Sequence, residues 1–258
     1  MKSILATLFC IILINPGVDD FSNLKYEQNS RFTKFSKSKK ALYSLPSTKE
    51  TFYCKCPYNK KKKVDLEACS YVTWKFTKRA QRVEAEHVVP AHTLCGKTVE
   101  WKKGHPQCFN KIRPYKGRKC APKRNPTCIR AYNDLHNLRP ANGEINAMRS
   151  NYKFGIIEGE ERKFGVCNFE VKNRVAEPPN DRQGDIARIY LFMHNAYKEL
   201  NLLNKKEYNK YIQWSKADPV DHAECSLNEN IFKLQGTYNS VVKALCDELI
   251  KTKGENRK

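Results

Sequence analysis

Apolar residues follow a helical period in the last third of the chain. The stripe advances by three and four positions through Ile186, Ile189, Tyr190, Met193, Tyr197 and Leu200. This spacing predicts one amphipathic helix whose apolar face joins the core. Two further helices are predicted at about residues 205–216 and 239–250, the second beginning just after the stop signal Gly236. The C-terminal part should therefore be helical.

The middle of the chain has a different pattern. Short extended pieces between residues 51 and 89, such as Thr51-Phe52-Tyr53 and Tyr71-Val72-Thr73-Trp74, predict a small antiparallel sheet. Residues 96–126 show no period of 2 or 3.6 and hold many Gly, Pro, Cys and basic residues, which indicates a long loop. Residues 21–50 are polar and basic, and we expect a mobile lead-in without chemistry. Because 258 residues can bury one sizeable core, we expect one domain over 51–250 and a charged tail at 251–258.

The first twenty residues predict a secretory signal peptide. Lys2 precedes an apolar run from Ile4 to Ile14, which Pro16 and Gly17 end. This run is shorter than the roughly 20 residues that a membrane-spanning helix needs, so an uncleaved anchor is the weaker alternative. No other stretch is apolar and long enough to cross a membrane. The mature protein should be secreted or periplasmic.

Export changes the interpretation of the cysteines. Cys10 lies in the predicted signal, and an even number remains, which in an oxidising compartment predicts up to five disulfides. A structural zinc site is the rival, but the one close pair, Cys54-Lys55-Cys56, has a single residue between its cysteines where zinc sites usually have two to four. The predicted disulfide cysteines are Cys54, Cys56, Cys69, Cys95, Cys108, Cys120, Cys128, Cys167, Cys225 and Cys246.

The charge of the chain points to a polyanionic partner. Forty-eight Lys and Arg against 27 Asp and Glu give a formal net charge of +21. Between Lys97 and Arg130 there are eleven basic residues and one acid, Glu100. Such a cationic face attracts nucleic-acid backbones through counterion release. A solvated surface, or a binder of acidic polysaccharide or lipid headgroups, fits the charge as well.

Two short runs carry candidate chemistry for phosphodiester hydrolysis. Mg²⁺ prefers hard oxygen ligands and keeps several waters, so Glu86 and a carboxamide such as Asn146 suffice to hold it. His87 suits the role of general base near neutral pH. Neighbours in an extended segment point to opposite sides, so Glu86 and His87 share one site only if the chain bends. Asn142 and Gly143 predict the cap and turn of a short helix that presents Asn146.

Several motifs in order resemble the endonuclease I family of periplasmic and secreted bacterial nucleases, over about residues 51–250. The stretches are Thr51-Phe52-Tyr53-Cys54-Lys55-Cys56, Asp65-Leu66-Glu67-Ala68-Cys69-Ser70-Tyr71, Glu86-His87-Val88-Val89-Pro90-Ala91, Asp134-Leu135-His136-Asn137-Leu138, residues 143–151, Ala176-Glu177-Pro178-Pro179 and Ile186-Ala187-Arg188. The resemblance implies a mixed α+β fold with a ββα-metal core. It also implies sequence-nonspecific cleavage of DNA, and often RNA.

Carried over by position, the resemblance implies roles for single residues. Glu86 and Asn146 become the Mg²⁺ ligands, with Ca²⁺ or Mn²⁺ as substitutes, and His87 becomes the general base. Arg118 matches the family arginine that holds phosphate, although an ordinary solvated arginine fits nearly as well. For His136 a buried hydrogen-bonding role is favoured over a chemical one. Further nucleic-acid contacts are expected at Arg149, Lys119 and Arg188, the last of which suits helix packing equally well.

The chain also departs from the family pattern. Tyr132 stands where the family usually has an acid, two residues before Asp134. Cys95 and Cys128 are additional to the usual eight cysteines, and we expect them to pair with each other. The sequence thus predicts a monomeric, secreted, Mg²⁺-dependent endonuclease that leaves 5′-phosphate and 3′-hydroxyl ends. The alternative is a secreted cationic protein that binds extracellular DNA or acidic polysaccharide and has lost catalysis.

Overall fold

The centre of the molecule is a pair of antiparallel strands followed directly by a helix. β1 (Val83–His87) pairs with β2 (Leu138–Asn142) in a register that runs from Val83 opposite Asn142 to His87 opposite Leu138. α7 (Gly143–Arg149) begins at the next residue, and the Asn142 side chain caps it by accepting from the backbone of Glu144 and Ile145. A Cβ at Gly143 would lie 2.5 Å from the Arg79 carbonyl oxygen, so only glycine fits there. The cap and turn predicted from Asn142 and Gly143 are confirmed.

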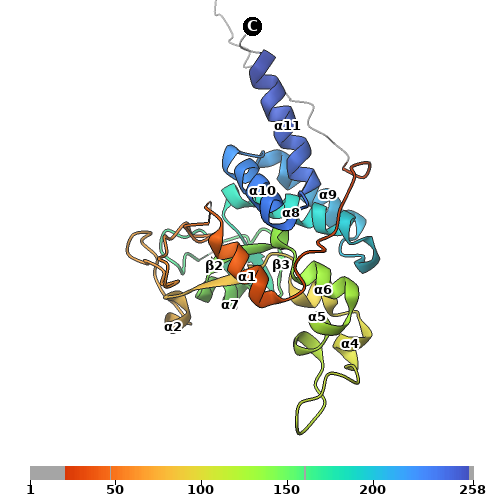
Figure 1. The fold of residues 1–258 in the computed structure, drawn as a ribbon. Helices are drawn as coiled ribbons and strands as arrows, with labels where there is room; N and C mark the ends of the chain where they lie inside the picture. The colour runs from red at the N-terminus through yellow and green to blue at the C-terminus, as the bar shows by residue number, and fades with distance from the viewer. Residues whose placement is uncertain (1–20, 47, 160, 256–258) are drawn as a thin grey trace, which may run out of the picture.

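This computed structural model describes residues 21–46, 48–159 and 161–255, with side chains described as far as residue 251. The predicted signal peptide, 1–20, lies outside the described residues, and so does the end of the predicted tail, 256–258. The fold is mixed α+β, as the sequence predicts, with small sheets at the centre and helices around them (Figure 1). Within the described part of the chain, no helix has the length and apolar character to span a membrane.

The C-terminal helices stack against the central unit. α8 (Gln183–Ala196), α9 (Lys205–Ala217) and α11 (Ser240–Glu255) confirm the three predicted helices. α10 (His222–Gln235) was not predicted, because the side that it buries is mostly polar: Glu224, Asn228, Ile231 and Gln235. These four positions have helical spacing, yet a search for apolar periodicity cannot detect them.

The small antiparallel sheet predicted between residues 51 and 89 is wrong in its pairing. β1 is the only strand assigned there among the described residues, and its partner β2 lies more than fifty positions away. Residues 51–82 contribute isolated bridges and the short helix α2 (Thr77–Ala80). A second small sheet joins β3 (Lys153–Phe154), β5 (Val175–Glu177) and β4 (Glu170–Lys172) in that order.

The prediction of a mobile lead-in is also wrong for its described residues. α1 (Phe35–Ser44) packs against β2 of the central strand pair. Leu42 and Leu45 join a small apolar cluster with Leu138 and Ile231. Phe21 is buried in the main core. The apolar residues of this segment are too sparse to form a visible period, so their burial depends on partners far along the chain.

The segment predicted as a long loop is partly helical. It contains α4 (Val99–Lys102), the 3₁₀ turn η1 (Gly117–Lys119) and α5 (Ala121–Arg124), and it lies between α3 (Ala91–Cys95) and α6 (Pro126–Tyr132). Only about residues 103–116 remain without a helix. The other 3₁₀ turns are η2 (Leu135–Asn137), η3 (Asn180–Arg182) and η4 (Lys198–Leu200).

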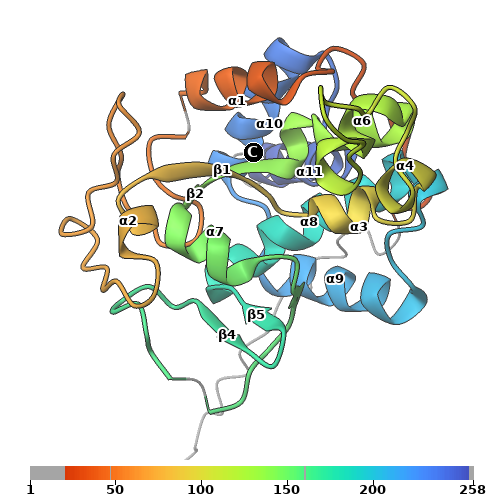
Figure 2. The same cartoon turned by 90° about the horizontal axis from the view of Figure 1, so that it is seen from below.

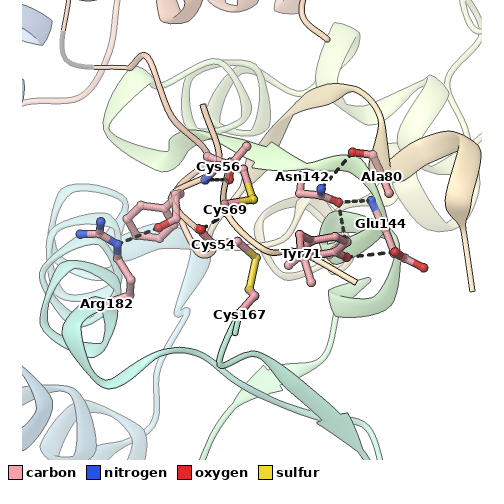
Figure 3. Close-up of a disulfide and its surroundings, with 12 residues drawn as sticks. Cys54, Cys56, Cys69, Tyr71, Ala80, Asn142, Glu144, Cys167 and Arg182 are labelled. Atoms are coloured by element: carbon pink, nitrogen blue, oxygen red, sulfur yellow. Dashed lines mark hydrogen bonds between the residues drawn. A yellow bond between two sulfur atoms is a disulfide. The ribbon is translucent and has the colours of Figure 1, made fainter. Parts of the chain in front are cut away.

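Five disulfides hold these pieces together, as the sequence predicts. The expected extra pair, Cys95 with Cys128, is confirmed and ties α3 to α6. Figure 3 shows Cys54–Cys167 and Cys56–Cys69, which lie near each other in the chain and anchor this segment beside the second sheet. The last two disulfides are Cys108–Cys120 and Cys225–Cys246.

Candidate active site

The β1–β2 strand pair lies between two helices, and each face of β1 meets one of them. Figure 2 shows α1 on one side of β1 and β2 and α7 on the other. Side chains alternate along a strand, so Glu84 and Glu86 lie on one face and His87 on the opposite face. Glu84 and Glu86 meet α7, whereas the ring of His87 stacks on Phe35 of α1 at a centroid distance of 5.0 Å.

The Glu86 carboxyl is buried with one oxygen satisfied and one free. Oε1 accepts from the Tyr53 hydroxyl at 3.0 Å and lies 3.6 Å from the Arg149 guanidinium. Oε2 is buried without a hydrogen-bond partner. Burial raises the pKa of Glu86 to about 7, although the charge of Arg149 and the Tyr53 hydrogen bond lower it. Oε2 therefore remains an acceptor that no described side chain satisfies.

Asn146 is oriented by a neighbouring carboxylate. Its amide Nδ2 donates to Glu84 Oε2 at 2.8 Å. Glu84 is held in turn by the guanidinium groups of Arg79 and Arg82. These hydrogen bonds lower the pKa of Glu84 against the opposing effect of its burial, so it stays ionised. Because the amide nitrogen is engaged by Glu84, Oδ1 is the end of Asn146 available to a cation.

The His87 ring is held in one tautomer. Nε2–H donates to the backbone carbonyl of Tyr132 at 2.8 Å, which leaves the lone pair on Nδ1. Nδ1 is buried and has no hydrogen-bond partner. The pKa of His87 is lowered to about 3, mainly by burial and also by the nearby charges of Arg118 and Arg149, so the ring is neutral at neutral pH. The Tyr132 carbonyl acts in the opposite direction because it favours the protonated ring.

A cleft of about 460 Å³ brings several of the candidates together. His87, Arg118 and Asn146 line it, whereas Glu86 is not part of its wall. Arg118 donates from Nε to the Tyr132 hydroxyl at 3.2 Å, so Tyr132 touches both His87 and Arg118. The remaining lining residues are Arg79, Ala85, Pro90, Ala91, His92, Trp101, Ala147, Ser150 and Asn151.

Comparison with known proteins decides the family. Residues 15–246 match the Endonuclease I family. The chain belongs to the endonuclease I family. It is 32% identical over 254 residues to Endonuclease-1 of Buchnera aphidicola subsp. Baizongia pistaciae, which covers 93% of this chain and 94% of that protein.

Two further relatives come from Aeromonas hydrophila. An extracellular deoxyribonuclease is 37% identical over 203 residues, 76% of this chain and 81% of the relative. A periplasmic deoxyribonuclease is 36% identical over 214 residues, 80% of this chain and 82% of the relative. Membership of the endonuclease I family makes this protein an endonuclease, and the locations in these names confirm the predicted secreted or periplasmic protein.

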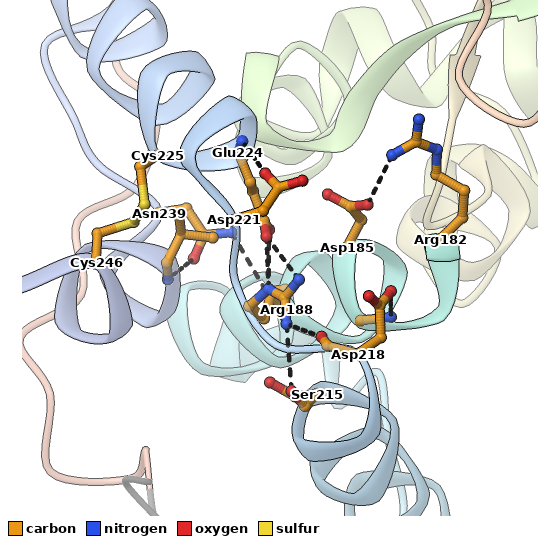
Figure 4. A network of polar contacts seen from close by, with 12 residues as sticks. Arg182, Asp185, Arg188, Ser215, Asp218, Asp221, Glu224, Cys225, Asn239 and Cys246 are labelled. Carbon is orange, nitrogen blue, oxygen red and sulfur yellow. Dashed lines mark hydrogen bonds and ion pairs between the residues drawn. A yellow bond between two sulfur atoms is a disulfide. The ribbon is translucent and has the colours of Figure 1, made fainter. Parts of the chain in front are cut away.

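Two expected nucleic-acid contacts do not fit the structure. Arg149 and Arg188 are each 1% exposed. The Arg149 guanidinium donates to the carbonyls of His87 and Val88, which holds the end of β1 against α7. Arg188 pairs with Glu224 at 2.6 Å and donates to the Asp218 carbonyl (Figure 4). Both arginines tie elements of the endonuclease fold together, so neither is placed to bind phosphate.

The other expectations have mixed outcomes. His136 is buried, and its Nε2 hydrogen-bonds the Thr237 carbonyl at 2.8 Å, as expected of a structural histidine. Lys119 is exposed in η1, beside Arg118. The bend that a shared site of Glu86 and His87 requires is absent, because both belong to β1 and occupy opposite faces. Of the three candidates, only His87 and Asn146 line the cleft, and Glu86 lies outside its wall.

Sequence reasoning missed three residues that shape the site. Glu84 orients Asn146, Tyr53 donates to Glu86, and Phe35 covers His87. Glu84 was accessible in principle, since it lies two positions before Glu86 and therefore on the same face of a strand. Tyr53 and Phe35 reach the site only through long-range packing, which leaves no local signal.

One carboxylate oxygen and one carboxamide oxygen are donors of the kind that a hard divalent cation prefers. Glu86 Oε2 is a buried carboxylate oxygen without a partner, and Asn146 supplies a carboxamide oxygen from the opposing helix. Mg²⁺ needs only one or two protein oxygens because it retains water ligands. No cluster of three or more His, Cys, Asp or Glu able to hold a metal is found in the part of the chain that the structure describes.

Proposed function

We propose that this chain is a metal-dependent, sequence-nonspecific endonuclease that hydrolyses DNA, and RNA as well, to 5′-phosphate and 3′-hydroxyl ends. The names of its Aeromonas relatives support DNA as a substrate. The observation that carries the proposal is the state of His87, which has its tautomer fixed by Tyr132 and a lone pair on an unpartnered Nδ1. A neutral histidine that lines a cleft with Arg118 and Asn146 is in the protonation state that a general base in phosphodiester hydrolysis requires, although its lowered pKa makes it a weaker base than a free imidazole.

Each residue has a separate task in this reaction. His87 takes the proton of the attacking water at Nδ1, and the Tyr132 carbonyl stabilises the resulting imidazolium through Nε2–H. Arg118 offers positive charge to the phosphate at the cleft wall. Glu86 and Asn146 would hold Mg²⁺, with Mn²⁺ or Ca²⁺ as substitutes. When bound, the ion supplies charge neutralisation to the phosphoryl and leaving oxygens.

A nuclease assay across a metal series tests this function. Supercoiled plasmid and a folded RNA are incubated with the full chain and Mg²⁺, Mn²⁺, Ca²⁺ or EDTA. We expect nicking followed by degradation of both substrates with Mg²⁺, and no cleavage in EDTA. Ligation of the nicked plasmid without prior kinase or phosphatase treatment reports the 5′-phosphate and 3′-hydroxyl ends.

The same assay separates the enzyme from the alternative function. A non-catalytic cationic binding protein retards the plasmid in a gel but leaves it supercoiled with every metal. Retardation without nicking under all conditions would therefore replace the proposed enzyme with a binding protein. Cleavage that persists undiminished in EDTA, after dialysis against the chelator, would remove the metal from the proposal.

A further inference from the structure

A cationic hairpin projects from the molecule next to the cleft. We call residues 104–119, which follow α4, the finger; Figure 1 shows this loop extending away from the body beyond α4. Phe109 and Pro114 form an antiparallel bridge, and Tyr115 donates its backbone N–H to the Cys108 carbonyl at 2.8 Å. The Cys108–Cys120 disulfide closes the base of the finger, and both cysteines are fully buried. The finger is thus anchored at its base and free of the body at its tip.

The tip of the finger is a tight turn that presents apolar side chains to solvent. The Asn110 side chain accepts from the backbone N–H groups of Ile112 and Arg113, and the Asn110 backbone N–H donates to the Arg113 carbonyl. Ile112 is 87% exposed, the highest fraction among the large apolar side chains that the structure describes, and Phe109 is 57% exposed. The hydrogen bonds hold the turn in shape, so these side chains are displayed by a preformed structure.

The charge around this tip has one sign. The sequence contains no acidic residue between Glu100 and Asp134. Within the finger the cations are Lys111, Arg113, Lys116, Arg118 and Lys119. Lys111 and Arg113 flank Ile112 directly and are exposed. An exposed apolar side chain between two cations can enter a nucleic-acid groove while the neighbouring cations bind phosphates.

The base of the finger reaches the candidate active site. Arg118 lines the same cleft as His87 and Asn146. A polyanion whose scissile phosphate lies in that cleft therefore extends along the cations of the finger toward Ile112. This continuity favours nucleic acid over an anionic lipid surface, for which a basic loop with an apolar tip is otherwise suited.

We infer that the finger is a wedge for duplex DNA. Its cations hold the phosphates on either side of a groove, and Ile112 and Phe109 lodge between neighbouring base pairs, opening the stack at a fixed distance from the scissile phosphate. The wedge rests on the proposed nuclease function and adds a preference for duplex substrate. Unstacking one base step costs a few kcal/mol, which the contacts along the bent duplex offset.

Cleavage rates on two substrate forms test the wedge. The full-chain double variant Ile112→Ser, Phe109→Ser is compared with wild type on a duplex and on the matching single strand. We expect the duplex rate to fall about tenfold or more while the single-strand rate stays within twofold. Val166→Ser is the matched control, because Val166 is also highly exposed, at 73%, and lies outside the finger.

A second measurement reports unstacking directly. A duplex with 2-aminopurine at successive positions is mixed with the wild type in EDTA, where binding is observed without turnover. We expect a fluorescence increase at one or two adjacent positions, which the double variant abolishes and Val166→Ser retains. Circular dichroism and an unchanged melting temperature establish that the double variant folds.

The outcomes separate this inference from the proposed function. If wild type cleaves neither substrate in any metal, the nuclease proposal fails. If wild type cleaves but the double variant loses both rates equally, or neither, the wedge is overturned. Loss of binding to phosphatidylglycerol vesicles with an unchanged duplex rate would also overturn it and assign the finger to a membrane surface.

Discussion

At the residue scale, β1 separates the two neighbouring groups to which the proposed chemistry assigns roles. Glu86 faces α7 and His87 faces α1, so the carboxylate and the imidazole are held by different partners. Arg149 links the two groups, because it pairs with Glu86, donates to the His87 carbonyl and lowers the pKa of His87. Tyr53 and Arg149 surround Glu86, whereas Tyr132 and Phe35 surround His87.

Replacement of the proposed base should remove turnover and leave binding intact. For His87→Ala we expect kcat to fall about 10² to 10⁴-fold, because general-base catalysis commonly contributes that much. DNA binding in EDTA should change little, since the phosphate contacts remain. Plasmid nicking rates and gel retardation measure the two quantities. His222→Ala, an exposed histidine at the start of α10, is the control, and near wild-type kcat in His87→Ala would exclude the role.

Replacement of the proposed metal ligand should act on the metal dependence. Glu86→Gln keeps the shape of the side chain, so an oxygen can still accept from Tyr53, but it removes the negative charge. We expect the Mg²⁺ concentration for half-maximal activity to rise at least tenfold, in line with the oxygen preference of this ion. Titration of activity against Mg²⁺ measures the shift, with the exposed Glu158→Gln as control. An unchanged midpoint would show that Glu86 is not a ligand.

At the element scale, the spacing of side chains along α7 matches the spacing along β1, so two polar residues of the helix meet two carboxylates of the strand. Asn146 and Arg149 lie three positions apart on the helix, and Glu84 and Glu86 lie two apart on the strand. These steps span roughly 5 and 7 Å respectively, so both pairs can meet across one interface. The contact of Asn146 with Glu84 and of Arg149 with Glu86 follows from this match.

The disulfide between α3 and α6 should contribute substantially to stability. Cys95 and Cys128 are 33 positions apart, fully buried, and frame the basic segment that carries Arg118. For Cys95→Ser with Cys128→Ser we expect a loss of about 2 to 4 kcal/mol in the free energy of unfolding, because the unfolded chain regains its freedom. Urea denaturation measures the loss. A midpoint equal to that of wild type would show that the bridge adds no stability.

At the scale of the whole molecule, the net charge of +21 sets how substrate is collected. The five disulfides hold this self-repelling chain compact, and the basic segment they frame adjoins the cleft. Phosphate attraction of this kind is independent of base sequence, which agrees with a nonspecific nuclease.

Salt should therefore weaken catalysis mainly through substrate capture. With about four phosphate contacts, raising NaCl from about 50 to 200 mM should lower kcat/KM about a hundredfold. The effect on kcat should be much smaller, because bound substrate has already displaced the counterions. Steady-state rates on an oligonucleotide at constant Mg²⁺ measure both. A flat dependence of kcat/KM on salt would show that the cationic face does not take part.

The success of sequence reasoning varied with how locally each feature is encoded. α8 could be predicted because its apolar residues repeat at helical spacing, and α7 because Asn142 and Gly143 mark its start. α10 and α1 could not, since one buries polar residues and the other has few apolar ones. Both depend on distant partners for their stability.

The candidate site divides in the same way. The order and identity of residues along the chain were enough to indicate the family, the ten disulfide cysteines, and Glu86, His87 and Asn146 as candidates. Tertiary structure alone decided that Glu84 orients Asn146, that Tyr132 fixes the tautomer of His87, and that Arg149 and Arg188 are buried ties. The reason is physical: motifs record which groups are present, but burial and hydrogen bonding arise between segments that meet only when the chain folds.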